Sequence, residues 1–336
     1  MNAAMKRSAS IGLFAGFCAF ALVFAWQGVR PVAAHLGEAG WTLLWVCVFA
    51  PPVQLVSAEA WRQLFPPQSR PGVWHTLAAS WIGSAVNTLL PVATIGGEVV
   101  KARLVAIWHG AILDAASTAV VDKTVQGIVV LFWTLAGVAL FAVLVPDPAV
   151  LAGAAGIAAA LALGIGAFIA LQLGGGVRFL ARRTARWHAL SVHIAAMHEG
   201  IRDVYRRPGS VIASCAYRVL ADVVPIGEVL LAAHLMGHPL GIVEAAMIRG
   251  LTAAMRGLAF MVPGALGVQE GGYLAMGVLL GEPSELMVAL SLASRVREIL
   301  PNVPFLIAWQ RVEGVALMKR RRQRGRGGPS RGPGPN

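Results

Sequence analysis

The chain has 336 residues, of which 57% are hydrophobic and only 13% are charged, with a formal net charge of +12 at neutral pH. An average soluble domain carries about 25% charged residues, so the composition excludes an ordinary soluble enzyme, a disordered protein and a small disulfide-rich secreted module. An apolar chain of this length is compatible with a lipid bilayer. The sequence therefore predicts an all-α, polytopic integral membrane protein.

Long windows without charged residues predict the membrane spans of the first half. They cover residues 8–29, 39–58, 71–97, 124–146 and 148–177. Each window is long enough to cross a hydrocarbon core of about 30 Å, since an α-helix rises about 1.5 Å per residue. Lys6 and Arg7 precede the first window, which we interpret as an uncleaved span because no secreted domain follows it.

The second half is also apolar, but charged residues interrupt it. We expect spans at about 209–236 and 240–262, and one or two more within 284–318. A charge at such a depth costs about 2.5–3.5 kcal/mol on insertion scales, so these side chains should face the protein interior or a wet cavity. The predicted fold is a bundle of about six to eight spans.

Two segments carry the excess of positive charge. Arg178–Arg207 holds seven arginines against two acidic residues, and the tail 319–336 holds seven basic residues and no acid. Basic segments beside spans remain in the cytoplasm and are attracted to anionic lipid headgroups. We therefore expect a bacterial inner-membrane protein with both termini in the cytoplasm, a basic cytosolic loop at 178–208 and a disordered polybasic tail. Nucleic-acid binding is the rival interpretation, but no folded module with base-stacking aromatic residues accompanies the basic residues.

The most informative stretch covers residues 87–103 and reads NTLLPVATIGGEVVKAR. A proline interrupts the helical hydrogen-bond ladder, and a glycine pair permits turns that other residues resist. Inside lipid, such a break is tolerated only where it is buried in protein or lines a cavity. The candidate helix break is Pro91. The candidate headgroup-binding residues here are Asn87, Gly96, Gly97, Glu98, Lys101 and Arg103.

A second copy of this motif, PGALGVQEGG, begins 172 residues later at Pro263. Glutamate follows proline by seven residues in both copies, and Pro263 and Gly264 are the candidate break in the second. Gly267 and Glu270 are the matching candidates for headgroup binding. Two unrelated interfacial loops are the alternative interpretation.

The likeness of the two halves extends downstream of the glutamates. Asp122 and Arg295 follow Glu98 and Glu270 by 24 and 25 residues, each within an apolar segment. Matching breaks in two halves are typical of a substrate site in a transporter that is built from repeats. We therefore predict two internally repeated broken or re-entrant helices, in repeat halves at about 8–177 and 209–318, within one transmembrane domain, 1–318.

Two further arginines, Arg249 and Arg256, share a helix face and have no acidic residue three or four positions away. We expect them to bind a ligand through charge-assisted hydrogen bonds, together with amides at the first turns of the restarted helices. Glu98 and Glu270 would orient the basic side chains or contact an amine.

Several charged residues also have a purely structural interpretation. Lys101 and Arg103 could be positive-inside anchors, and Asp122 with Lys123 could lie at the cytosolic interface. Two sets have the spacing of intrahelical ion pairs, namely Arg218 with Asp222 and Arg295 with Glu298. We favour that structural role for both sets.

The motifs resemble the lysylphosphatidylglycerol synthase transmembrane region, a flippase-like domain. The resemblance lies in the run from Asn87 to Arg103, a His109-Gly110 turn, the helix that carries Asp122, and the second motif at 263–272. It covers about residues 10–315 and implies movement of a polar-headed lipid, a phospholipid or a hopanoid-type lipid, between leaflets. The length suits a stand-alone, hopanoid-biosynthesis-associated group. Gln269 departs from the commonest form, in which we expect arginine.

The expected function is therefore a lipid transporter without enzymatic activity. Because only 18 residues follow Met318, we expect no aminoacyl-lipid synthase activity. Scattered histidines and three isolated cysteines predict no metal site, and we expect no cofactor. Two alternatives remain: a headgroup transferase with Glu98 or Glu270 as general base, and a scaffold that binds lipid-biosynthesis enzymes.

Overall fold

The computed structural model describes residues 37–90, 96–144, 148–173, 188–258 and 267–311. These residues form helices and no strands, which confirms the all-α prediction. The helices are η1 (Gly40–Phe49), α3 (Ala50–Gln63), α4 (Val73–Leu89), α5 (Gly96–His109), α6 (Ile112–Leu144), α7 (Pro148–Leu173), α9 (His188–Tyr205), α10 (Pro208–Leu235), α11 (Ile242–Leu258), α12 (Val268–Leu280), α13 (Ser284–Ile299) and η3 (Leu300–Asn302). Residues 303–311 are also helical.

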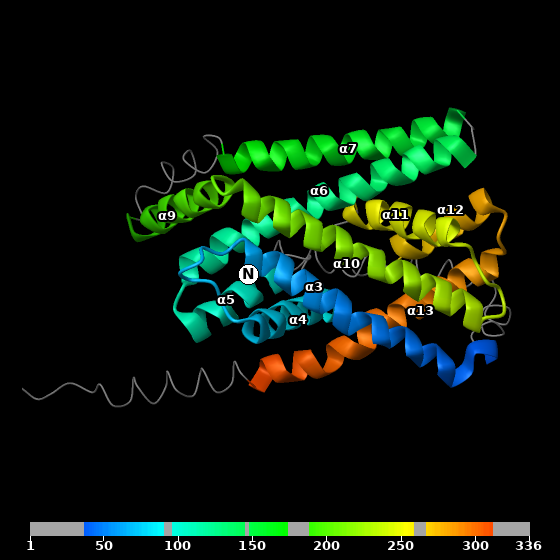
Figure 1. Cartoon of the computed structure of the whole chain (residues 1–336), viewed down its shortest axis with the longest axis horizontal. Coiled ribbons are helices and arrows are strands. Elements are labelled where there is room, and N and C mark those ends of the chain that lie inside the picture. The colour runs from blue at the N-terminus through cyan, green and yellow to red at the C-terminus, as the bar shows by residue number, and fades with distance from the viewer. Residues whose placement is uncertain (1–36, 91–95, 145–147, 174–187, 259–266, 312–336) are drawn as a thin grey trace, which may run out of the picture.

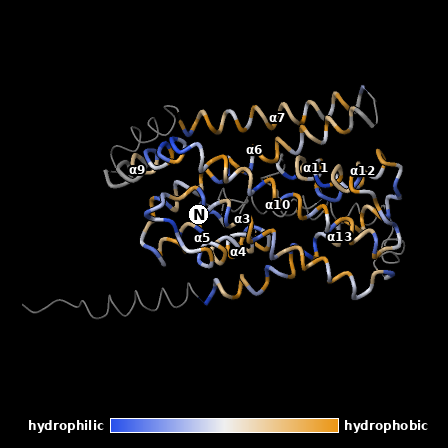
Figure 2. Tube along the Cα trace, viewed as in Figure 1, coloured by the Kyte–Doolittle hydropathy of each residue, from blue (hydrophilic) through white to orange (hydrophobic). Residues whose placement is uncertain are grey.

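Among the described residues, three helical segments are long and apolar enough to cross a membrane. They are Gly37–Gln63, Ile112–Leu140 and Leu151–Leu173. Only 12% of the most apolar window of the last segment is buried, so most of α7 presents apolar side chains outward. Figure 2 shows hydrophobic residues along α6 and α7. The protein is therefore a membrane protein, as its composition predicts.

The window 71–97 is not one continuous span, because it contains the predicted break. Helix α4 ends at Leu89, and Leu90 has an extended backbone with φ −116° and ψ 146°. This is the conformation expected of a residue before proline. Helix α5 then begins at Gly96 and packs against α4. Pro91 itself lies outside the described residues.

A second pair, α11 and α12, has a similar arrangement. Helix α11 ends at Leu258, and α12 begins at Val268 after Gly267, which has a φ of 77° that favours glycine. Side chains near the end of α11 contact the start of α12, as in the hydrogen bond between Arg256 and Gln269. The two helices therefore form an antiparallel hairpin. Pro263 and Gly264 lie outside the described residues.

We call α4–α5 the first hairpin and α11–α12 the second hairpin. They lie toward opposite ends of the long axis of the molecule, while α6 and α10 run along both (Figure 1). Helix α10 packs against α3, α6, α11 and α13. Pro225 lies inside this helix, between Arg218 and Glu228. Each half therefore contains a helix that stops, turns and packs against its successor.

Three sequence predictions fall partly or wholly outside the described residues. The span at 8–29 and the tail at 319–336 lie outside them, as does the first part of the basic loop. In the remainder of that segment, residues His188–Tyr205 form helix α9, which packs against α6.

Arg207 ties the start of α10 to the end of α3. Its guanidinium donates hydrogen bonds to the carbonyl oxygens of Phe65 and Leu64, at 3.0 and 2.8 Å. We expect Arg207→Ala to lower the free energy of unfolding by about 1–2 kcal/mol, because two backbone acceptors lose charged donors. Thermal melting of the purified protein in detergent measures this change.

The neighbouring Arg206 provides the control, because its ion pair with Asp203 is exposed, with side-chain exposures of 67% and 62%. Arg206→Ala should cost about 0.5 kcal/mol or less. Equal melting temperatures for the two variants would contradict the assigned role of Arg207.

Candidate functional site

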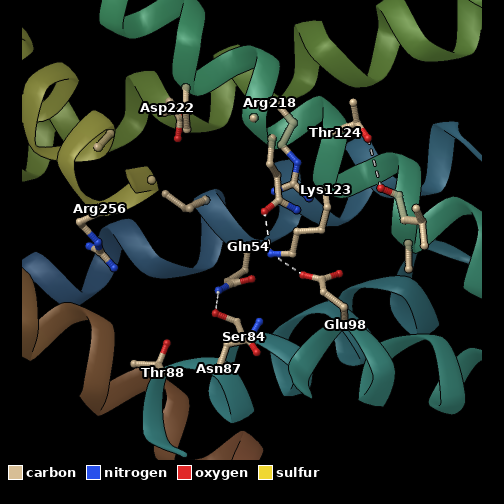
Figure 3. A pocket seen from close by; sticks show the side chains of 18 of the residues that line it. Gln54, Ser84, Asn87, Thr88, Glu98, Lys123, Thr124, Arg218, Asp222 and Arg256 are labelled. Carbon is tan, nitrogen blue, oxygen red and sulfur yellow. Dashed lines mark hydrogen bonds and ion pairs between the residues drawn. The ribbon is translucent and has the colours of Figure 1, made fainter. Parts of the chain in front are cut away.

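A cavity of about 1440 Å³ lies where the two hairpins approach each other. It is lined by the last turns of α4, the first turns of α5 and the last turns of α11, together with parts of α3, α6, α7, α10, α13 and η3. Figure 3 shows side chains from these elements that surround the space, with Arg256 and Glu98 on opposite sides of it. The ends at which both helices break therefore line one shared cavity.

The lining has an apolar part and a charged part. Val130 of α6 and Leu161, Ile165 and Phe168 of α7 belong to the apolar part. The charged residues of the lining are Arg103, Lys123, Arg218, Arg249, Arg256, Arg297, Glu98, Asp222 and Glu298. Six are basic and three are acidic, and uncharged polar groups such as Gln54 and Ser84 lie among them. The cavity can therefore accommodate both a polar group and hydrocarbon.

A buried ion cluster supports the cavity in the first half. The Lys101 ammonium lies 2.5 Å from Glu98 and 2.6 Å from Asp122, and Lys123 lies 2.7 Å from the other oxygen of Glu98. Arg218 of α10 donates to both oxygens of Asp122, at 2.8 and 2.9 Å. Asp122 is fully buried and does not line the cavity, so it holds α5, α6 and α10 together from behind the wall.

This cluster corrects one interpretation of the sequence. Arg218 and Asp222 are spaced as an intrahelical pair, but Arg218 binds Asp122 on another helix. The Asp122 side chain has 0% exposure, so it is enclosed by protein, while its position relative to the cytosolic interface stays a prediction. Helical spacing alone could not reveal a partner that lies 96 residues away in the chain.

The first amides of the restarted helices already have partners in the protein. The Gly97 N–H donates to the side-chain oxygen of Asn87, at 2.7 Å. The Gly267 N–H donates to the Glu270 carboxylate, also at 2.7 Å. Asn87 of α4 caps the start of α5, and Glu270 caps the start of its own helix, so the structure does not direct these two amides toward a ligand as expected.

In the second half, Glu270 and Arg295 form a fully internal pair. Arg295 Nε lies 3.0 Å from Glu270, whose side chain has 0% exposure. The expected intrahelical pair of Arg295 with Glu298 is longer, at 3.8 Å. Neither Gly267, Glu270 nor Arg295 belongs to the cavity lining. Their arrangement fixes the start of α12 against α13.

Arg256 has an acidic partner on α13, although none is close to it in the sequence. It forms an ion pair with Glu298 and donates to the side-chain oxygen of Gln269, at 2.9 Å. Arg297 lies 2.5 Å from the buried Glu228 of α10 and 3.6 Å from Glu298. Helix α10 therefore contributes to the ion pairs of both halves, through Arg218 and Glu228.

Arg249 and Asp222 differ from the other charged residues that line the cavity. Within the described part of the chain, neither makes a hydrogen bond or an ion pair, although each attracts the other electrostatically. The Nε of Arg249 is buried without a hydrogen-bond partner. These two groups are available to a ligand.

The structure therefore divides the predicted site residues into two sets. Asn87, Glu98, Arg103, Arg249 and Arg256 line the cavity. The others support it from behind or begin the helices, namely Gly96, Gly97, Lys101, Asp122, Gly267, Glu270 and Arg295. Sequence reasoning missed Arg297, and it gave Lys123, Arg218, Asp222 and Glu298 structural roles. Their presence inside apolar segments is the signal that could have indicated the cavity.

No group of three or more histidine, cysteine, aspartate and glutamate side chains in the described ranges could hold a metal ion. The lining of the cavity offers ionic and hydrogen-bonding recognition by arginine, lysine and carboxylate side chains, beside a hydrocarbon surface.

Comparison with known proteins supplies the identity of the domain. The family model described as "Lysylphosphatidylglycerol synthase TM region" matches residues 9–304. No curated protein matches the chain, and no solved structure does. The match covers most of the chain, including both hairpins, all of the cavity lining and both ion clusters. The protein therefore belongs to the lysylphosphatidylglycerol synthase transmembrane region family and is a lipid-related membrane protein.

Proposed function

We propose that the protein is a lipid transporter that moves a polar-headed lipid between the two leaflets of a membrane. The observation that carries the proposal is the cavity of about 1440 Å³ with its charged and apolar parts, at the turning ends of both hairpins. A lipid has the same two-part chemistry. Its head can bind the charged lining, while its chains contact the apolar side chains of α6 and α7.

The position of the cavity supports transport rather than simple lipid binding. Transporters that are built from repeats bind substrate where broken helices from the two halves meet, and access then alternates between the two sides. Here the hairpins come from opposite ends of the molecule, and α10 carries one ion-pair partner for each half (Figure 1). A movement of one hairpin against α10 would open the cavity toward one side.

We place the transporter in a bacterial inner membrane with both termini in the cytoplasm. The support is the concentration of basic residues in Arg178–Arg207 and 319–336, since such segments remain on the cytoplasmic side and attract anionic lipids. The lipid is either a phospholipid or a hopanoid-type lipid, and a non-enzymatic role fits the ion pairs of Glu98. A carboxylate between two ammonium groups is a poor general base, which disfavours the headgroup-transferase alternative.

A pair of substitutions on α7 tests the proposal. Gly164 lines the cavity and a Cβ there meets nothing within 4 Å, so Gly164→Phe should fold and fill the space beside the apolar part. In vesicles with a fluorescent lipid, we expect this variant to slow exchange between leaflets at least about tenfold, equivalent to about 1.4 kcal/mol in the barrier. The readout is the rate at which a membrane-impermeant reductant quenches the label.

Gly166→Phe is the matched control. Gly166 also has open space at Cβ but does not line the cavity, so its variant should exchange lipid at the wild-type rate. Wild-type exchange no faster than in protein-free vesicles, with phospholipid and with hopanoid probes, would refute transport. A change in lipid mass during the incubation would instead favour the transferase.

A further inference from the structure

The charges around the cavity do not balance. The lining itself has six basic and three acidic residues. Behind it, the ion pairs add Lys101, Arg295, Asp122, Glu228 and Glu270. Arg103 has an interaction outside these ion pairs and is left out of the balance. The rest of the set contains seven basic and six acidic residues, with a net charge of +1. Residues 91–95 and 259–266, which connect the helices of each hairpin, contain no charged residue.

An excess of positive charge inside a membrane protein requires compensation. A buried charge is tolerated when it is paired and hydrogen-bonded, and removal of the partner is strongly unfavourable. Most basic side chains of the set meet this condition through the ion pairs described above. Arg249 has no ion pair among the described residues, and its Nε is buried without a hydrogen-bond partner. The protein would therefore stabilise an external anion most strongly beside Arg249.

The unpartnered atoms of the cavity are mostly hydrogen-bond donors. Three donor atoms of the lining are buried without a hydrogen-bond partner, namely Trp81 Nε1, Arg218 Nε and Arg249 Nε. Asn302 Oδ1 is an acceptor that also lacks a hydrogen-bond partner. Asp222 is the one carboxylate of the lining without an ion pair, and it is attracted to both Arg249 and Arg218. A cationic head would have to compete with two guanidinium groups for Asp222, while a phosphate would meet unused donors.

We infer that the cavity selects a lipid whose headgroup carries a net negative phosphate, and that Arg249 binds this phosphate. A lipid with a net positive headgroup is excluded by the same excess of positive charge. The inference rests on the proposed function for its choice of a lipid, because inorganic phosphate has the same ionic chemistry. The apolar side chains of α6 and α7 in the lining favour the lipid.

The test measures binding to the purified full-length chain in a neutral detergent. Phosphatidylglycerol should raise the melting temperature at concentrations at which phosphatidylcholine and inorganic phosphate do not. Arg249→Gln should weaken the apparent affinity for phosphatidylglycerol at least about tenfold, because a charge-assisted interaction becomes a neutral one. Arg249→Lys, which keeps the charge, should retain part of the preference for phosphatidylglycerol.

Arg202→Gln is the control for non-specific attraction, since Arg202 is an exposed residue of α9 outside the cavity. It should bind phosphatidylglycerol within about twofold of the wild type. Without added lipid, Arg249→Gln should melt no lower than the wild type, because the substitution removes a cation from the protein interior that has no ion pair among the described residues. A lower melting temperature would show that Arg249 has a structural partner and would overturn its assignment to a ligand.

Equal binding of phosphatidylglycerol and phosphatidylcholine, or an unchanged affinity in Arg249→Gln, would also overturn the inference. Equal stabilisation by inorganic phosphate would reject a lipid as the source of the phosphate. The binding test does not depend on lipid exchange. Selective binding of phosphatidylglycerol without lipid exchange would refute transport but leave the phosphate site standing. Unselective lipid exchange that Arg249→Gln does not affect would refute the phosphate site but leave transport standing.

Discussion

Replacing Gly97 with alanine is expected to prevent the normal packing of the first hairpin. A Cβ at this position would lie 2.0 Å from the carbonyl oxygen of Gly83 and 2.6 Å from Cγ of Asn87. The first overlap involves backbone, so a side-chain rotation cannot relieve it. We expect a loss of about 3 kcal/mol or more in the free energy of unfolding, at or above the usual cost of overpacking.

The second overlap removes a hydrogen bond as well. Asn87 accepts the Gly97 N–H, so displacement of its side chain leaves the start of α5 without this cap. The separation of α4 and α5 would also disturb the cavity, since Asn87 and Glu98 line it from the two helices. The variant should therefore melt far below the wild type and lose lipid exchange in vesicles.

Gly271→Ala is the matched control in the second hairpin. Gly271 belongs to the corresponding glycine pair, but a Cβ there meets nothing within 4 Å. Alanine has the higher helix propensity, so this variant should be as stable as the wild type or slightly more stable. Equal melting temperatures for the two variants would show that α4 and α5 do not approach as closely as the structure indicates.

The sequence predicted the helix breaks for a local reason. A proline restricts the residue before it, and Leu90 is extended as that rule requires. The charges inside apolar segments likewise predicted an internal polar site, because lipid cannot solvate them. These rules depend on neighbouring residues or on the surrounding medium, and both can be read from one sequence.

The pairing of the charges could not be predicted in the same way. Arg256 has no acidic residue within one helical turn, yet Glu298 lies beside it across 42 residues of chain. Arg249 lacks a nearby acid in the same manner and makes no ion pair among the described residues. Two arginines with the same local pattern thus have different roles, which tertiary packing alone decides.

The same limit applies to the two equivalent glutamate positions of the repeated motif. Glu98 and Glu270 occupy equal places relative to their prolines, but only Glu98 reaches the cavity. Glu270 instead caps α12 and binds Arg295. The two halves therefore share a backbone arrangement and differ in their contribution to the site, with the first hairpin supplying Glu98 and the second supplying Arg249 and Arg256.

Asp122→Asn should be the most damaging isosteric substitution in the ion clusters. Asp122 is fully buried and receives Lys101 at 2.6 Å, Arg218 at 2.8 and 2.9 Å, and Gln126 at 3.1 Å. Asparagine keeps the shape but removes the charge, so Arg218 loses its counterion and Lys101 keeps only Glu98. We expect a loss of about 3–5 kcal/mol in the free energy of unfolding, measured by thermal melting in detergent.

Asp203→Asn is the matched control, because its ion pair with Arg206 is exposed to solvent. It should change stability by about 0.5 kcal/mol or less. Adding Arg218→Met to Asp122→Asn should recover part of the loss, since Arg218 has no other ion pair in the described part of the chain and Lys101 keeps Glu98. If the double variant is less stable than Asp122→Asn alone, the damage comes from lost packing, and the cluster is not held together by the charge of Asp122.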